Sequence, residues 1–177
     1  MVKMCKEKDV PIDTIIGDDD STAISQVRKV LNINLRKLSD KNHVRKNVTK
    51  QLYKIKPELP ELSVSVIGAI TKSFNYMLSQ KRGKPNEIEG GLKSVVYHNF
   101  GVHSYCDRSW CGGIEQGNDY RHKNLPYGRD LQSESLKEAL LNIFVKGLSK
   151  QAEKLAFLGS TQANEAFNAS LAAKAPK

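Results

Sequence analysis

Residues 15–22 read IIGDDDST, an apolar run that stops at three consecutive carboxylates and then opens into a helical pattern. The stretch from Val10 to Gly17 is rich in isoleucine and valine, which is typical of a buried strand. Adjacent carboxylates repel and raise one another's pKa, so three in a row call for an explanation. One is a divalent cation such as Mg²⁺, which carboxylates hold together with substrate phosphates. The alternative is local: Asp20 or Ser21 caps the helix that follows.

The residues after this stretch predict a strand–helix–strand unit. Apolar side chains recur with a period of 3.6 residues from Thr22 to Leu31, which predicts an amphipathic helix. Residues Ile33 to Leu38 then alternate apolar and polar side chains, which suits a short second strand of the same sheet. A helix between two strands is the connection that parallel pairing requires.

Helical patterns dominate the rest of the chain. Pro57 and Pro60 mark a linker, and residues 101–127 keep no period. Helices are expected over residues 40–53, 63–80, 87–100 and 133–146, and over the alanine-rich stretch 152–173 with an interruption near Gly159-Ser160. The sequence therefore predicts an α+β fold that is predominantly helical, with a short sheet.

The composition is that of a soluble globular protein, and the positive net charge indicates that it binds polyanions. The 177 residues suffice for one domain with a core, and no apolar run is long enough to span a bilayer. The net charge of +9 favours nucleic acid as a partner. Positive charge is concentrated between residues 28 and 56, where the candidate DNA contacts are Arg36, Lys41, Arg45, Lys46 and Lys50. The alternative for these side chains is a solvated helix face.

Two further groups of polar residues are candidates for chemistry. In D40-K-N-H43 the spacing of i and i+3 places Asp40 and His43 on one helix face; alternatively, Asp40 caps the helix and His43 lies on the surface. In the segment 161–168, TQANEAFN, Asn164, Glu165 and Asn168 could share a polar edge.

Taken in order, GDDDS at a strand end, D-x-x-H after the next strand and N-E-x-F-N near the C-terminus resemble the Mutator-like transposases. The resemblance covers about residues 14–177. It implies a ribonuclease H-like core that uses a DDE triad and two divalent metals, Mg²⁺ or Mn²⁺. By this resemblance Asp18 is the second aspartate, with Asp19 and Asp20 as alternative registers, and Glu165 is the final glutamate.

The resemblance also assigns Asp40 and His43 to the C/D-x-x-H signature of that family, in support of the catalytic residues. The family's first aspartate lies on an upstream strand, whereas only Asp9 and Asp13 precede GDDDS here. We therefore expect the C-terminal portion of a transposase, with a truncated core that binds DNA but is inactive alone.

The function class that competes is a non-enzymatic DNA-binding or zinc-dependent interaction module derived from a transposase. The resemblance further implies a nuclear location (cytoplasmic if the protein is not imported) and a homo-oligomer within a transposition complex. The expected divisions are residues 10–56 for the partial core, 57–150 for a helical insertion and 151–177 for the helix that carries Glu165.

Cysteine and histidine residues gather in the aperiodic stretch. An odd count of three cysteines argues against a disulfide framework and in favour of metal. Cys106 and Cys111 are expected to bind one Zn²⁺ with two histidines: His103 ranks first, His122 second, and His98 is the alternate because it falls at a helix end. Such a loop has little apolar content, so a structural metal would supply folding energy. The alternative is an exposed, reduced thiol pair.

Overall fold

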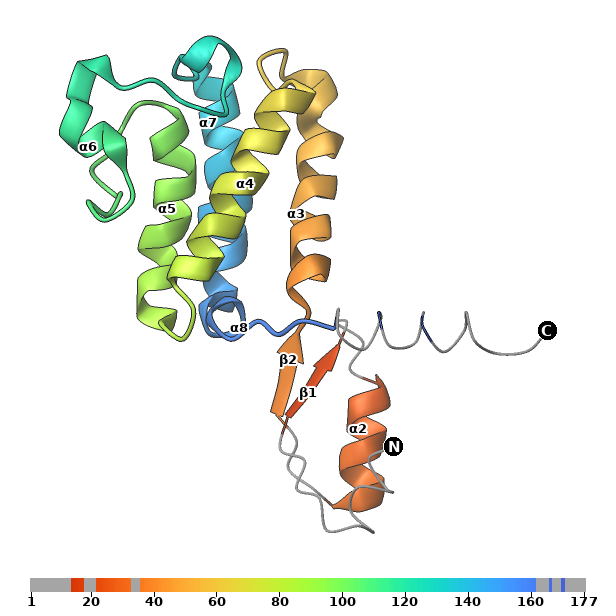
Figure 1. Cartoon of the computed structure of the whole chain (residues 1–177). Helices are drawn as coiled ribbons and strands as arrows, with labels where there is room; N and C mark the ends of the chain where they lie inside the picture. The colour runs from red at the N-terminus through yellow and green to blue at the C-terminus, as the bar shows by residue number, and fades with distance from the viewer. Residues whose placement is uncertain (1–13, 18–21, 33–35, 162–165, 167–169, 171–177) are drawn as a thin grey trace. The chain divides into compact units, whose positions relative to one another are not determined.

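The computed structural model describes residues 14–17, 22–32, 36–161, 166 and 170 (Figure 1). The chain divides into two compact units, one within residues 1–44 and 157–177 and the other formed by residues 45–156. Each unit is described by itself. Among the described residues, no helix is sufficiently long and apolar to cross a membrane.

The first unit contains the predicted strand–helix–strand arrangement. Strands β1 (Thr14–Gly17) and β2 (Arg36–Ser39) pair in parallel, and helix α2 (Thr22–Leu31) lies between them in the sequence. The register aligns Thr14 with Arg36 and Gly17 with Ser39, so both strands end at the same edge of the sheet. The α+β prediction and the span of α2 are confirmed, while residues 10–13 and 33–35 of the predicted strands lie outside the described residues.

A later segment of the chain, at Gly159, pairs with Asp40, the residue that directly follows β2. Asp40 and Gly159 form a parallel bridge, in which the amide of Gly159 donates to the carbonyl of Ser39 and the amide of Lys41 donates to that of Gly159, both at 3.0 Å. A Cβ on Gly159 would lie only 2.5–2.8 Å from the side chain of Ile16. Glycine at this position therefore allows the segment to pass close to β1.

Helix α3 (Lys41–Ile55) runs from the first unit into the second. Val44, Val48 and Leu52 are buried at successive intervals of four residues, as the pattern predicted. Tyr53 is 47% exposed because it lies 100° further round the helix than Leu52.

The second unit is built from helices packed around α5, with short turns between them (Figure 1). Ser63 and Ser133 begin two of these helices by accepting a hydrogen bond from the third following amide. The elements are η1 (Lys56–Glu58), α4 (Val64–Gln80), η2 (Pro85–Glu87), α5 (Ile88–Asn99), α6 (Gly112–Gln116), η3 (Gly117–Asp119), η4 (Pro126–Gly128), α7 (Glu134–Leu141), η5 (Asn142–Leu148), η6 (Ser149–Gln151) and α8 (Ala152–Ala156).

The core of this unit joins α4, α5 and the α7–η5 segment. Phe74 and Phe144 pack with ring centroids 5.5 Å apart, and both are fully buried. The predicted helix 133–146 is regular only to Leu141 and continues as a π-helix, η5. A face that repeats every four residues drifts around an α-helix, and the wider π turn corrects that drift. The buried side chains of this face are Leu136, Leu140, Phe144 and Leu148.

Candidate functional site

Two histidines and two cysteines converge between the end of α5 and the start of α6. One nitrogen or sulfur atom from each of His98, His103, Cys106 and Cys111 lies within 4.8 Å of the others. His98 comes from the last turn of α5, and Cys111 directly precedes α6. These four residues are called the metal centre below, because their donor atoms could hold a metal ion.

Short turns between α5 and α6 position His103, Cys106 and Cys111. The amide of Cys106 donates to the carbonyl of His103 at 3.0 Å, which closes a tight turn between these two residues. The amide of Cys111 donates to the carbonyl of Asp107 at 3.1 Å, and the carboxylate of Asp107 accepts from the amide of Ser109 at 2.9 Å. Backbone hydrogen bonds rather than a packed core thus order this stretch.

The separations of the four atoms fit tetrahedral zinc. The Nδ1 atoms of His98 and His103 are 3.2 Å apart. His98 Nδ1 lies 3.6 Å from Cys106 Sγ and 3.5 Å from Cys111 Sγ, and His103 Nδ1 lies 3.4 Å from Cys111 Sγ. Zinc bonds of ~2.0 Å to nitrogen and ~2.3 Å to sulfur, at tetrahedral angles, imply about 3.3 Å between nitrogens and about 3.6 Å from nitrogen to sulfur.

Electrostatics keep two of these ligands neutral while no cation is bound. Burial, together with the neighbouring His122 and His103, lowers the pKa of His98 to about 4. Burial and the neighbouring Cys111 raise the pKa of Cys106. His98 is therefore ready to donate a lone pair at neutral pH, whereas the thiol of Cys106 must lose a proton to a metal.

Aromatic side chains and a glycine enclose the metal centre. Trp110 packs edge-on against His98, with ring centroids 5.8 Å apart. The hydroxyl of Tyr120 lies 3.4 Å from Nε2 of His98, the ring nitrogen that faces away from the thiols. A Cβ on Gly113 would lie 2.3–2.6 Å from ring atoms of His103, so only glycine leaves room for this ring.

His122 lies beside the metal centre but is not one of its four members. Its Nε2 pairs with Oδ1 of Asp130 at 2.9 Å, and burial lowers its pKa despite this carboxylate. The ring centroid of His122 is 5.0 Å from that of His98 and 6.4 Å from that of His103. His103 is in the group as predicted, whereas the alternate His98 takes the place predicted for His122: the end of α5 brings His98 to the thiols, and Asp130 binds His122.

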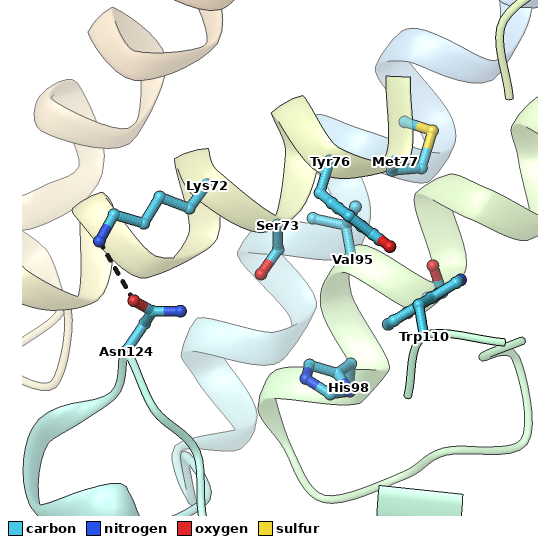
Figure 2. Close-up of a pocket in the computed structure, with 9 residues that line it drawn as sticks. Lys72, Ser73, Tyr76, Met77, Val95, His98, Trp110 and Asn124 are labelled. Atoms are coloured by element: carbon cyan, nitrogen blue, oxygen red, sulfur yellow. Dashed lines mark hydrogen bonds between the residues drawn. The ribbon is translucent and has the colours of Figure 1, made fainter. Parts of the chain in front are cut away.

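A pocket of about 310 Å³ opens on the other side of His98 (Figure 2). The indole of Trp110 and the ring of Tyr76 meet edge-on at 5.6 Å, and Lys72 Nζ donates to Asn124 Oδ1 at 3.1 Å. The metal centre therefore shares His98 with the pocket, and Trp110, which packs against His98, also lines the pocket. Its lining consists of Lys72, Ser73, Tyr76, Met77, Ser94, Val95, His98, Trp110 and Asn124.

Asp40 connects distant parts of the first unit. Its Oδ1 accepts from the amides of Asn42 and His43 at 2.7 and 3.0 Å, which caps α3. Its Oδ2 accepts from the amide and the hydroxyl of Thr161 at 2.8 and 2.9 Å. Burial by itself raises the pKa of Asp40, but the hydrogen bonds from Thr161, His43 and Asn42 outweigh it, and the pKa is lowered. The D-x-x-H spacing thus forms a helix cap that also holds the C-terminal segment.

The other predicted site residues fall into two groups. The predicted carboxylates Asp18, Asp19, Asp20 and Glu165 lie outside the described residues. Of the predicted DNA contacts, Arg45, Lys46 and Lys50 are exposed on α3. Lys41 is half-buried at the start of that helix, and the guanidinium of Arg36 lies 4.5 Å from the ring centroid of Phe157.

Comparison with protein families finds a match to the Mutator-like transposase model over residues 1–111. The matched stretch contains GDDDS, the D-x-x-H residues and all four members of the metal centre. No curated protein and no solved structure matches the chain.

Proposed function

Because this chain belongs to the Mutator-like transposase family, we propose that it binds DNA and contributes to metal-dependent phosphoryl transfer. One observation of the sheet carries this proposal. Parallel strands β1 and β2 end together at Gly17 and Ser39, and Gly159 joins the same edge through its bridge to Asp40. Asp18 follows Gly17 directly, and Glu165 comes shortly after Gly159 in the sequence. The described residues Gly17 and Gly159, which precede the two proposed carboxylates in the sequence, therefore lie at one edge of the sheet.

In this proposal Asp18 and Glu165 hold Mg²⁺ or Mn²⁺, with Asp19 and Asp20 as alternative registers for the first ligand. Such a cation supplies stabilisation of the attacking and leaving oxygens in an in-line displacement at phosphorus. Asp40 ties the segment that leads to Glu165 to the end of β2 through its bonds to Thr161. We propose that residues 1–177 by themselves do not cleave or join DNA, because the resemblance identifies only two carboxylates of the DDE triad among them, Asp18 and Glu165.

We further propose that His98, His103, Cys106 and Cys111 bind one structural Zn²⁺. The separations of their donor atoms support this assignment. Four protein ligands complete a tetrahedral shell and leave no position for a reactive water, so the cation would act in folding rather than in chemistry. Of residues 101–111, only Cys111 is among the buried apolar side chains of the described residues. Apolar packing therefore contributes little folding free energy here, and bonds to the metal would supply it.

For DNA binding, the exposed cations of α3 are the first contacts to test. The affinity for a labelled duplex should fall steeply with salt, as phosphate neutralisation requires. Replacing Arg45, Lys46 and Lys50 together by glutamine should reduce the slope of log affinity against log salt by up to about 0.9 per lost phosphate contact. A control with the same net charge changes three other exposed residues, Arg82, Lys146 and Lys150, to glutamine. Equal slopes in both triple variants would contradict the assignment to α3.

For chemistry, the unmodified chain with Mn²⁺ and a labelled duplex should give no cleavage or strand transfer. Cleavage that Asp18→Asn abolishes would overturn the proposed inactivity and would support the assignment of Asp18. Absence of DNA binding at low salt would reject the proposed function altogether. A nuclear location completes the proposal, and imaging of a tagged chain in cells tests it.

A further inference from the structure

The loop formed by residues 121–129, called the Tyr127 loop below, exposes a tyrosine whose presence folding does not explain. Tyr127 is 92% exposed, and its φ of 56° and ψ of 12° place it in the left-handed region. A side chain strains this conformation because its Cβ crowds the backbone, whereas glycine adopts it freely. Neither burial nor backbone preference favours tyrosine here, and strain of this kind gathers at functional positions.

Hydrogen bonds hold the Tyr127 loop closed. The amide of His122 donates to the carbonyl of Gly128 at 3.0 Å, and the amide of Gly128 donates to that of Leu125 at 3.1 Å. Leu125 is buried and anchors the loop from within. The ring of Tyr127 is thus presented by a loop whose backbone is held closed, so the backbone loses little freedom on binding.

The base of the Tyr127 loop rests on the metal centre. The ring of His122 stands nearly perpendicular to that of His98, with centroids 5.0 Å apart, and its Nε2 is paired with Asp130. The same histidine supplies the amide that closes the loop. Order at the metal centre should therefore be transmitted to the loop.

Cations surround the exposed ring. Residues 121–129 contain Arg121, Lys123 and Arg129, all exposed, and no acidic residue. Arg121, Tyr127 and Arg129 line a polar cleft of about 700 Å³. Asp130 also lines this cleft, and its Oδ1 pairs with Nε2 of His122 at 2.9 Å.

One guanidinium in this cleft is already oriented. Nη1 of Arg121 donates to the carbonyls of Asn118 and Tyr120 at 3.2 and 3.0 Å. These bonds use only Nη1, so Nε and Nη2 keep donors that can be directed at a phosphate. An aromatic ring that shares a cleft with cations is the combination that binds a nucleic-acid strand whose bases have a free face.

We infer that the Tyr127 loop binds single-stranded DNA, with a base stacked on Tyr127 and phosphates paired with Arg121 and Arg129. The inference rests on the proposed DNA binding and adds to it a site separate from the cations of α3. Duplex DNA buries the faces of its bases, so it can use the arginines but not the tyrosine.

Fluorescence anisotropy with labelled oligothymidine and with a blunt duplex of equal length tests this inference on the full chain loaded with zinc. Tyr127→Ala should weaken binding of oligothymidine about tenfold, the scale of one lost stacking contact. Tyr127→Phe should retain the affinity, and neither change should alter duplex binding. Tyr127→Gly should also lose affinity for the single strand while melting no lower than the parent protein, because glycine relieves the strain.

The arginines have their own readout. Arg121→Gln combined with Arg129→Gln should lower the salt slope for oligothymidine by about 0.7 per lost phosphate contact. The matched control is Arg82→Gln combined with Lys150→Gln, which removes the same charge from exposed positions elsewhere and should leave a steeper slope.

Three outcomes would overturn the inference. If the parent protein binds both DNAs and Tyr127→Ala changes neither affinity, the inference fails while the proposed function stands. If Tyr127→Ala weakens single-strand and duplex binding equally, the tyrosine does not stack on a base. If the parent protein binds neither DNA, the proposed function fails together with the inference.

Discussion

The carboxylate of Asp40 accepts two hydrogen bonds from Thr161, a residue 121 positions later in the chain. The same carboxylate caps α3 through Asn42 and His43, so each of its oxygens accepts two bonds. With both oxygens occupied in this way, Asp40 is suited to positioning the C-terminal segment.

The first prediction concerns this connection. In Asp40→Asn, the amide nitrogen of the new side chain cannot accept a hydrogen bond, so either the cap or the contact with Thr161 is lost. The expected cost is about 1–3 kcal/mol, the range for hydrogen bonds to a buried charged group. Amide exchange at Lys41, Gly159 and Thr161 should accelerate. Thr161→Val, which removes only the hydroxyl bond, should have a smaller effect. Unchanged exchange in Asp40→Asn would show that the connection contributes nothing to stability.

The second prediction is a pH dependence with a defined sign. The pKa of Asp40 is lowered in the folded chain, so its stabilising effect is complete above the unfolded pKa of about 3.9. It is lost as the pH falls through the lowered pKa, when protonation weakens all four bonds. The amide of Thr161 should therefore keep its protection from exchange down to about pH 4 and lose it below. Asp40→Asn should remove this step, and a step of the same size in the variant would assign it to another carboxylate.

The third prediction tests the close passage of Gly159 over β1. In Gly159→Ala the new Cβ meets the branched side chain of Ile16 at 2.5–2.8 Å, which includes Cγ2 close to the backbone. The expected destabilisation is about 1–3 kcal/mol, as for overpacking. Adding Ile16→Ala should recover part of the loss in a double-mutant cycle. Strictly additive effects of the two changes would mean that the side chains do not meet.

The fourth prediction is the pH dependence of zinc affinity. The raised pKa of Cys106 means that its thiol keeps a proton at neutral pH, and zinc must displace it. His98, with a pKa of about 4, is already neutral and releases no proton above pH 6. Apparent affinity should therefore rise with pH, because zinc binding releases the proton of the Cys106 thiol. Competition with a chromogenic chelator between pH 6 and pH 8 measures this slope, and a flat response would contradict binding through thiolates.

The local periodicities of the sequence were sufficient for most of the fold. The span Thr22–Leu31 matches α2 in full, and the buried face of α4 contains all the apolar residues predicted for it. The π-helix after Leu141 was not predictable, because a four-residue repeat of apolar side chains is compatible with either helix. The contact between Asp40 and Thr161 could not be predicted either, because local sequence patterns give no information about contacts between residues 121 positions apart.

At the metal centre the chemistry was easier to predict than the choice of ligands. Cysteine and histidine in an aperiodic loop indicated a metal. Sequence spacing, however, does not report the direction of a side chain at a helix end. His98 was ranked last for that reason, yet the last turn of α5 directs its Nδ1 toward both thiols. His122 follows a flexible stretch as expected, but Asp130 engages its ring.

Zinc content, measured together with X-ray absorption at the zinc edge, tests whether one Zn²⁺ is held by the four ligands His98, His103, Cys106 and Cys111. The parent protein should carry one zinc per chain with two sulfurs at ~2.3 Å and two nitrogens at ~2.0 Å. His98→Ala should lose most of the metal or exchange one nitrogen for a water, whereas His122→Ala should keep the metal and both nitrogens. Full zinc occupancy in His98→Ala together with loss in His122→Ala would show that His122, not His98, is a ligand. Absence of zinc from the parent protein would show that these residues do not form a zinc site.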